Sequence, residues 1–310
     1  MQNMQNNTPW PAPKVAIVGQ GAIGSLIGFK CQKLGYEVQH LVRRQRQQSY
    51  CTVTDLAGKT HHLTPNTGLI TQPQQFDLLL VPVKAYQVLP VLRQLQSFIT
   101  PQQVIVLLHN GMGTTEQVKE SFPNNPLIAA TTSYGALKPD ANTLIETGKG
   151  HTHFGWLGQV DTATKQAIEP VLSALLPPSY WHQDINLALW KKLAINAVIN
   201  PLSAIHNVRN GELADHQYQR DISTLCDEIA KVMTAQGYSI SSAELNKNAQ
   251  QVIAATANNY SSMHQDLKFN RKSEIEFITG YVCAKANELN CPVPFNQRLL
   301  EQVTRLESVN

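Results

Sequence analysis

The stretch VAIVGQGAIG, at residues 15–24, joins an apolar run to three glycines with the spacing G-x-G-x-x-G. In that spacing Gly19 allows a tight turn out of a strand, Gly21 lets the backbone approach a pyrophosphate, and Gly24 lets a helix pack closely on the strand. The helix N-terminus then offers free N–H groups to phosphate oxygens. The stretch predicts a strand, a turn and a helix to about Leu34, with these candidate cofactor residues: Gly19, Gln20, Gly21, Ala22, Ile23 and Gly24.

Further apolar runs follow this unit, and each ends in a polar or glycine-bearing turn. They lie at Glu37–Val42, Asp77–Lys84, Val104–Gly111 and Leu127–Gly135. Strands that alternate with helical stretches predict a mostly parallel sheet with helices on its faces. Together with the glycine spacing, this pattern is typical of a Rossmann-type dinucleotide-binding domain.

The second half of the chain shows a different pattern, in which long helical periods replace the strands. We expect helices at Ile185–Ile199, Asp221–Gln236, Ser242–Asn258 and Ser273–Leu289. The predicted fold class is therefore α/β, with an N-terminal Rossmann-type parallel-sheet domain at residues 14–180 and a C-terminal all-helical domain at residues 181–310. Residues 1–13, rich in Gln and Asn and then in Pro, are expected to form a flexible tail.

Composition excludes several classes of function. The chain has 310 residues, 42% of them hydrophobic, and a formal net charge of +3, which argues against binding to nucleic acid or to an anionic membrane. Its five cysteines are odd in number and show no Cys-x-x-Cys pair, so a disulfide framework or a zinc site is not expected. The same cysteine pattern favours a cytoplasmic protein. Residues 1–13 have no basic start and no apolar core, so we do not expect a signal peptide, and without an apolar run of about 18 residues we do not expect a transmembrane helix.

An arginine, rather than a carboxylate, follows the second expected strand. In domains that prefer NAD, an acidic residue about 20 positions beyond the glycine turn holds the ribose 2′-hydroxyl. Here Arg43 follows Val42, and Glu37 lies too early for that role. A guanidinium can pair with a 2′-phosphate, so the pattern favours NADPH. A solvated basic turn is the alternative interpretation.

Two polar residues lie at the expected carboxyl ends of other strands, where open parallel sheets bind their ligands. Lys84 ends the run VPVK, and Asn110 ends VIVLLHN just before Gly111. Each residue is a candidate for contact with the cofactor. Each also has a plain structural alternative, a surface cation for Lys84 and a turn residue for Asn110.

A lysine and two asparagines recur along an otherwise apolar helical segment. Lys192, Asn196 and Asn200 are spaced four residues apart and share one helix face. Buried lysine and asparagine are costly without partners, so the stripe indicates either a ligand or a hydrogen-bond network. A lysine in such a site can act as a general acid. Pro201 is expected to end or kink this helix.

Further along, Ser262 and Glu274 belong to a second polar group. Glu274 follows Ser273, the expected N-cap of the last helix in the prediction above. Its plain alternative role is to complement the helix dipole. Ser262 and Asp266, four residues apart, could likewise form a local pair within a helix.

Taken together, these motifs resemble the 2-dehydropantoate 2-reductase, or ketopantoate reductase, family. The matching stretches occur in the family's order and run from about Lys14 to near the end of the sequence. They are GQGAIG, LLLVPVKAYQV, LLHNGMGTTEQ, GHTHFG, LWKKLAINAVINPLSAI, NGEL, YSSMHQD and SEIEFITGY. The combination of HNGMG with WKKLAINAVINPL is more specific than the glycine turn.

The resemblance implies reduction of 2-dehydropantoate to (R)-pantoate by NADPH, a step in pantothenate synthesis that needs no metal ion. It implies that Lys192 is the catalytic proton donor and Glu274 an active-site glutamate that contacts the substrate hydroxyl and the cofactor. Substrate-binding positions fall on Asn196, Asn200, Asn210 and Ser262. Cofactor-side positions fall on Arg43, Lys84 and Ala136, and Asn110 lies between cofactor and substrate.

Two other functions remain open. One is a related two-domain NADP-dependent oxidoreductase that acts on another small 2-oxo or 3-hydroxy acid. The other is a non-catalytic NADPH sensor or scaffold, which would have no need of a lysine and asparagines on one helix face. The expected partner is a small 2-oxo acid, and the expected state is a monomer or homodimer.

Overall fold

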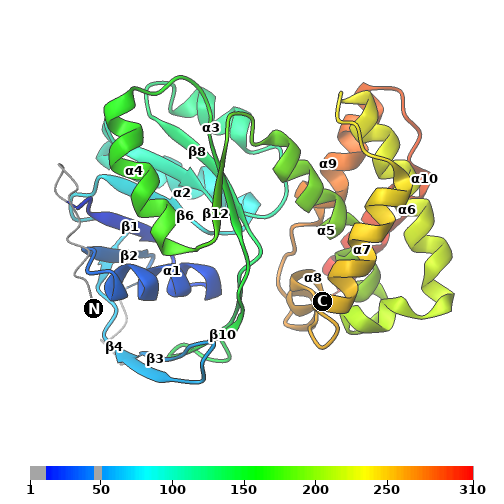
Figure 1. Cartoon of the computed structure of the whole chain (residues 1–310), viewed down its shortest axis with the longest axis horizontal. Coiled ribbons are helices and arrows are strands. Elements are labelled where there is room, and N and C mark those ends of the chain that lie inside the picture. Colours follow the sequence, from blue (N-terminus) through cyan, green and yellow to red (C-terminus); the bar gives the residue numbers. More distant parts are fainter. Residues whose placement is uncertain (1–11, 45–50, 310) are drawn as a thin grey trace. The chain divides into compact units, whose positions relative to one another are not determined.

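A computed structural model describes residues 12–44 and 51–309 of the chain (Figure 1). The chain divides into two compact units. The first comprises Met1–His109 and Thr114–Ile185, and the second comprises Asn110–Gly113 and Asn186–Asn310. Of the tail expected at residues 1–13, all but Ala12 and Pro13 lie outside the described residues.

The first unit is built on an eight-stranded sheet. Its strands, in spatial order, are β12 (Ser179–His182), β11 (Thr152–Trp156), β8 (Leu127–Thr132), β7 (Val104–Leu107), β6 (Leu78–Val81), β1 (Val15–Val18), β2 (Val38–Val42) and β5 (Thr67–Leu69). Neighbouring strands pair in parallel except β8 and β11, which are antiparallel. The predicted α/β class with a parallel-dominated sheet is confirmed.

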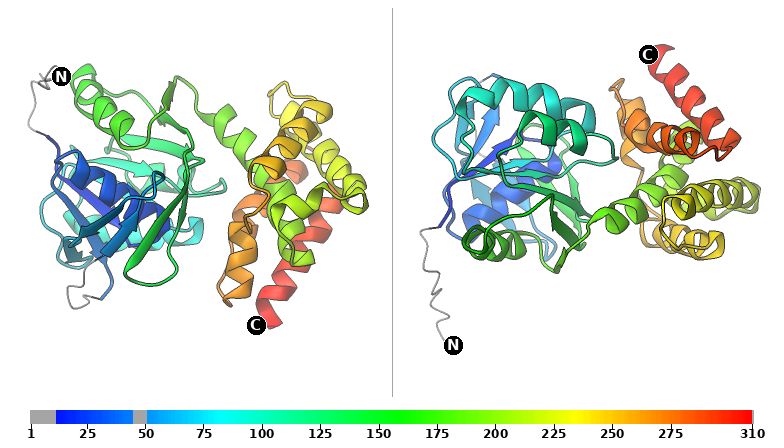
Figure 2. Two further views of the ribbon diagram at one scale, coloured as in Figure 1. Left: turned by 60° about the horizontal axis from the view of Figure 1, so that its bottom comes forward. Right: turned by 90° about the horizontal axis from the view of Figure 1, so that it is seen from above.

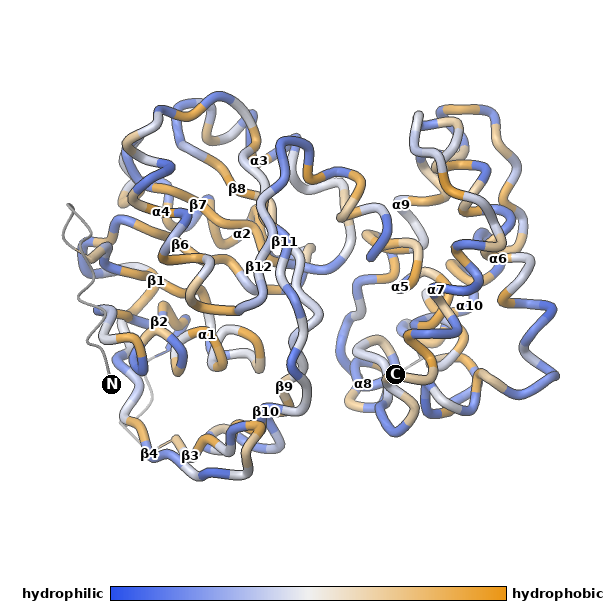
Figure 3. The backbone as a smooth tube through the Cα atoms, viewed as in Figure 1, coloured by the Kyte–Doolittle hydropathy of each residue, from blue (hydrophilic) through white to orange (hydrophobic). Residues whose placement is uncertain are grey.

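Helices cover both faces of this sheet (Figure 2). They are α1 (Ala22–Lys33) and α4 (Thr162–Leu175) on one face, and α2 (Ala85–Leu95) and α3 (Thr115–Ser121) on the other. Successive residues of β1 enter different cores, because side chains alternate across a strand. Ile17 packs in the same core as Leu26 of α1, whereas Val18 packs in the same core as Val88 of α2. Burial on both faces explains why the central strands are almost continuously apolar (Figure 3).

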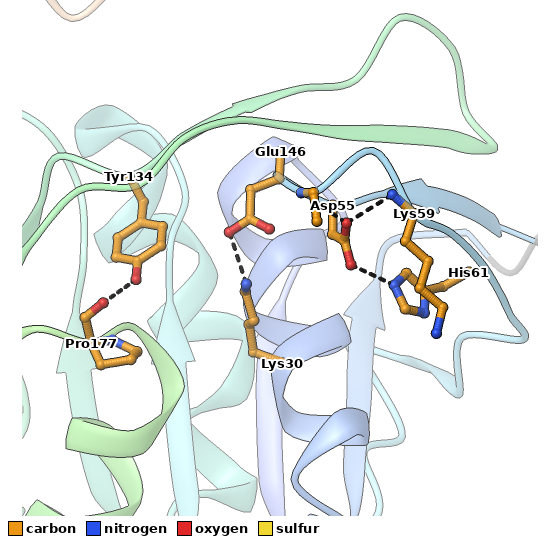
Figure 4. A network of polar contacts seen from close by, with 8 residues as sticks. Lys30, Asp55, Lys59, His61, Tyr134, Glu146 and Pro177 are labelled. Atoms are coloured by element: carbon orange, nitrogen blue, oxygen red, sulfur yellow. Dashed lines mark hydrogen bonds and ion pairs between the residues drawn. The ribbon is translucent and has the colours of Figure 1, made fainter.

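A smaller sheet, which we did not predict, lies beside α1 in the first unit. Its order is β4 (Thr60–Leu63), β3 (Cys51–Thr54), β10 (Thr143–Gly148) and β9 (Gly135–Leu137). Lys30 of α1 bonds the nearly buried Glu146 of β10 at 2.8 Å (Figure 4). In the same region Tyr134 donates a hydrogen bond to the carbonyl of Pro177 (Figure 4). The ion pair of Lys30 with Glu146 holds the small sheet to α1.

The second unit is helical apart from its loops. It contains α5 (Asn186–His206), a short 3-10 turn at Asn210–Ala214, α6 (His216–Ala235), α7 (Ser242–Ala255), α8 (Ser262–Lys268), α9 (Ile275–Glu288) and α10 (Pro294–Val309). Helix α5 packs against each of the other five helices and forms the centre of the unit's apolar core. Among the described residues, none of the helices has the length and apolar character needed to cross a membrane.

Pro201 was expected to end or kink this helix, and the end is wrong, because α5 continues through Pro201 to His206. A proline inside a helix removes one backbone hydrogen bond, at a cost of roughly 3 kcal/mol. The residues that follow, Leu202 and Ser203, are wholly buried, at 1% and 0% exposed. Tertiary packing therefore overrides the local preference to stop.

Candidate active site

The polar stripe of α5 lies within the helical unit. Asn200 is 7% exposed, and Lys192 and Asn196 are partly buried among apolar neighbours. Trp190 and Leu193, which flank Lys192, belong to the core. The stripe is thus a set of polar groups on a central helix whose buried residues are mostly apolar.

Burial changes the acidity of Lys192. Loss of water around its ammonium group lowers the pKa of Lys192 from 10.5 to about 8, while the negative charge of Glu274 acts in the opposite direction and raises it. Glu274 is 3% exposed and stands at the N-cap of α9. The structure therefore brings together, as an interacting pair, two residues that lie 82 positions apart in the sequence.

Asn110 reaches the same carboxylate from a loop that follows β7. Its side-chain amide donates a hydrogen bond of 3.4 Å to Glu274. The loop is held by the backbone N–H of Met112, which donates to the carbonyl of Phe277 at 2.9 Å. Gly111 has φ +84°, and a Cβ atom there would lie 2.5 Å from the Phe277 carbonyl oxygen. Only glycine fits at this position, and the loop delivers Asn110 to Glu274.

The other two substrate-side candidates differ in their surroundings. Ser262 is the first residue of α8 and is exposed, and α8 packs against α5. Asn210 is 7% exposed and donates its amide to the hydroxyl of Thr256 at 2.9 Å. Its side-chain oxygen is buried without a hydrogen-bond partner in the described part of the chain. The amide nitrogen of Asn210 is therefore fixed to the end of α7, and its side-chain oxygen remains as a possible hydrogen-bond acceptor.

In the first unit, the three glycines of the turn lie where the backbone turns sharply, opens or packs closely. Gly19 has φ +79°, and a Cβ atom on Gly24 would approach Pro82 to 3.2 Å. Gly21 is the N-cap of α1, and among the described residues nothing lies within 4 Å of the position that a Cβ atom on Gly21 would take. Open space at an uncapped helix N-terminus fits a phosphate group.

Two residues that support this turn were missed in the sequence. Lys138 donates to the carbonyl of Gln20 at 2.9 Å and places a cation beside the turn. The imidazole Nδ1 of His40 lies 2.9 Å from the carbonyl oxygen of Gly19, and burial lowers the pKa of His40. An added Cβ on Gly28 would lie 2.2 Å from the His40 ring. Gly28, four residues after Gly24, was therefore the sequence feature that could have indicated a side chain packed against α1 at this point.

The remaining cofactor-side candidates belong to neighbouring elements of the first unit. Arg43 is exposed just beyond β2, and Lys84 is the N-cap of α2, three residues beyond β6. Strands β6 and β2 lie on either side of β1 and run parallel to it. Arg43, Lys84 and Gly19 therefore all follow the carboxyl ends of neighbouring strands. Ala136 lies in β9 of the small sheet.

Comparisons with known proteins agree along nearly the whole chain. Residues 15–159 match the family model "Ketopantoate reductase PanE/ApbA", and residues 184–307 match the model of its C-terminal part. The 2-dehydropantoate 2-reductase of Vibrio cholerae is 37% identical over 293 residues, which cover 94% of this chain and 97% of that protein.

Solved structures share the fold at lower identity. D-mandelate dehydrogenase with NADH and anilino(oxo)acetate superposes with a TM-score of 0.88 at 24% identity, covering 96% of this chain and 98% of that one. A dimeric ketopantoate reductase from Staphylococcus aureus superposes with a TM-score of 0.78 at 19% identity, covering 96% and 99%. With both halves matched by its models and a curated relative above 30% identity, the chain is a member of the ketopantoate reductase family of oxidoreductases.

Proposed function

We propose that this protein reduces 2-dehydropantoate to (R)-pantoate with NADPH, as a step of pantothenate synthesis. The observation that carries the proposal is the Lys192–Glu274 pair, in which burial lowers the pKa of the lysine to about 8. An acid with a pKa near the working pH transfers its proton efficiently. The family relationship supports the same reaction.

In this proposal the bound nicotinamide supplies the hydride. Lys192 binds the C2 carbonyl oxygen of the substrate and donates a proton to it as negative charge develops there. Asn196, Asn200 and Ser262 hydrogen-bond the carboxylate and hydroxyl of the substrate, which fixes the face that reacts. Glu274 favours the protonated form of Lys192 and accepts a hydrogen bond from the substrate hydroxyl. Asn110 holds the Glu274 carboxylate in place through its own hydrogen bond. Asn210 offers its unpartnered oxygen to the substrate.

For the cofactor, we propose NADPH rather than NADH. The turn at residues 19–24 would bind the pyrophosphate on the N-terminus of α1, with Lys84 and Ala136 nearby on the cofactor side. Arg43 follows β2 where a carboxylate would otherwise hold the 2′-hydroxyl, and a guanidinium favours a 2′-phosphate. Comparing kcat/KM with NADPH and with NADH tests this choice, and a preference for NADH would refute it.

The reaction is tested by the loss of NADPH absorbance on addition of 2-dehydropantoate. Lys192→Ala is expected to reduce kcat by 10²-fold or more, as for the loss of a general acid. Lys191→Ala is the matched control, because Lys191 is the exposed neighbour on the same helix. Near wild-type turnover in Lys192→Ala would refute its assignment as the acid.

A second candidate is reduction of a different small 2-oxo acid. A D-mandelate dehydrogenase with the same fold, solved with NADH and anilino(oxo)acetate, is the reason to include other 2-oxo acids in the test. A panel of 2-dehydropantoate, phenylglyoxylate and short aliphatic 2-oxo acids separates the two by kcat/KM. A non-catalytic sensor would bind NADPH and oxidise it with none of them.

For assembly and location, we propose a cytoplasmic monomer or homodimer that binds neither nucleic acid nor a membrane. The small net charge of +3 supports the exclusion of nucleic acid. The dimeric relative from Staphylococcus aureus makes a homodimer the state to test first. Light scattering on a size-exclusion column gives the mass, and a mass of three or more chains would refute the proposal.

A further inference from the structure

Two serine hydroxyls join α5 to α8 inside the helical unit. The Oγ atoms of Ser203 and Ser261 lie 2.7 Å apart, and the two residues are 0% and 5% exposed. Ser203 also hydrogen-bonds the carbonyl of Asn200 at 3.1 Å. Ser261 accepts the backbone N–H of His264 at 3.1 Å and so caps α8. A buried chain of hydrogen bonds thus runs from the backbone of Asn200 to the first turn of α8.

Helix α8 depends on such contacts for its position. It has seven residues, and isolated helices of that length are not stable in water. Its second polar contact with the end of α5 joins the ring Nε2 of His264 to the side-chain oxygen of Asn207 at 2.8 Å. Asn207 and His264 line a pocket of about 540 Å³, together with other residues at the end of α5 and in α8 and with Leu306 of α10. Met263 of α8 packs in the apolar core of the unit, so apolar packing and these directed hydrogen bonds together hold α8 in place.

The position of α8 matters because its first residue is Ser262. Ser261 precedes Ser262 directly, and Asn200 lies three residues before Ser203. The hydroxyl chain therefore connects the backbone of Asn200 to Ser261, the residue directly before Ser262. Ser203 itself is wholly buried, so its hydroxyl does not contact solvent.

We propose that Ser203 is a positioning residue, which holds Ser262 in place relative to Asn200 through its hydrogen bond to Ser261. The inference rests on the proposed function, because Ser262 and Asn200 are taken to bind the substrate. Without the hydroxyl of Ser203, the start of α8 is less restrained. Binding of the substrate must then also order this segment, which weakens the binding. The expected signature is weaker substrate binding with unchanged chemistry.

The first experiment measures Ser203→Ala with 2-dehydropantoate and NADPH. We expect the KM for 2-dehydropantoate to rise about fivefold, the size of one net hydrogen bond, while kcat and the KM for NADPH stay within about twofold. Thr279→Val is the matched control, because its hydroxyl is also 0% exposed in the same unit and bonds nothing in the described part of the chain. A fall in kcat with unchanged KM would overturn the inference.

A double-mutant cycle then asks whether Ser203 acts through Ser262. In a Ser262→Ala background, Ser203→Ala is expected to raise the KM by less than about twofold. Multiplicative effects of the two substitutions would show independent action and overturn the inference. An unchanged KM in Ser262→Ala alone would also overturn it.

Hydrogen exchange separates this inference from the proposed function. Ser203→Ala is expected to speed amide exchange across residues 262–268, and Thr279→Val is not, whatever substrate the enzyme uses. Unchanged exchange in Ser203→Ala would overturn the inference. If the wild-type protein fails to oxidise NADPH with 2-dehydropantoate, the proposed function fails while the exchange result still stands.

Discussion

Replacing Glu274 by glutamine is expected to move the pH dependence of the reaction to lower pH. Lys192 must carry its proton to act as the acid, so activity is present below the pKa of Lys192 and is lost as the pH rises through it. The carboxylate of Glu274 raises that pKa against the larger, lowering effect of burial. Glutamine keeps the size of the side chain and removes the charge. The pKa of Lys192 must then fall below about 8.

The size of the effect follows from the two influences on Lys192. An opposite charge close to a titrating group shifts its pKa by roughly 1 to 3 units, and the smaller figure gives a conservative estimate. With a pKa of about 8, about three-quarters of Lys192 is protonated at pH 7.5. With a pKa of about 7, only about a quarter is protonated. Glu274→Gln should therefore lose about threefold in kcat/KM at pH 7.5 from this cause, and almost nothing at pH 6.

The assay is kcat/KM for 2-dehydropantoate between pH 5.5 and 9.5 in buffers of constant ionic strength. Glu276→Gln is the control, because Glu276 lies in the same helix and pairs with Lys272 on the exposed surface at 3.0 Å. We expect the basic limb to shift down in Glu274→Gln and to stay in place in Glu276→Gln. A loss of kcat/KM that is the same at every pH would refute the reasoning, because it would reflect lost substrate contacts alone. A basic limb that moves to higher pH would refute it too.

Three further expectations concern stability and cofactor choice. Gly111→Ala combines a left-handed backbone with a clash against the Phe277 carbonyl and should cost at least about 2 kcal/mol, seen as a lower midpoint of thermal unfolding. Glu228 is 6% exposed and accepts three hydrogen bonds at the start of α10, so Glu228→Ala should cost roughly 2–4 kcal/mol in urea unfolding, and a loss below 1 kcal/mol would contradict this account. Arg43→Ala should lower kcat/KM with NADPH about tenfold and leave NADH nearly unchanged, and equal losses with both would argue against a 2′-phosphate contact.

The sequence was most informative where backbone geometry allows only one residue type. The spacing of Gly19, Gly21 and Gly24 reports a turn, a close approach and a tight packing contact, so it predicted both β1 and α1. The central strands were equally clear, because burial on both faces leaves almost no polar residues. Each of these signals is local in the chain.

The small sheet could not be predicted, because its strands are short and only half buried. In β4 the residues of Thr60–Leu63 alternate between exposed and partly buried, and two of the four are histidines. Its sequence, Thr-His-His-Leu, gives neither an apolar run nor an alternation of apolar with polar residues. Its stability depends on pairing with β3 and on the distant strand β10, which no local pattern reports.

In the candidate site, too, local patterns could be predicted and contacts between distant segments could not. The spacing of Lys192, Asn196 and Asn200 predicted that they share one helix face, because helical periodicity alone determines it. The pairing of Lys192 with Glu274, and of Glu274 with Asn110, joins segments that are far apart in the sequence. Similarly, Lys138 was missed because its link to the carbonyl of Gln20 spans 118 positions.

The four residues Asn110–Gly113 have a consequence for how this enzyme can be taken apart. They are encoded in the middle of the first unit and fold as part of the second. A gene fragment that begins at Asn186 would produce helices that lack the donor for the Phe277 carbonyl and the amide that holds Glu274. Chimeras that exchange the helical unit between relatives therefore need two grafts, the long C-terminal block and this short loop. A single junction near residue 186 would leave the recipient's loop facing a foreign helix.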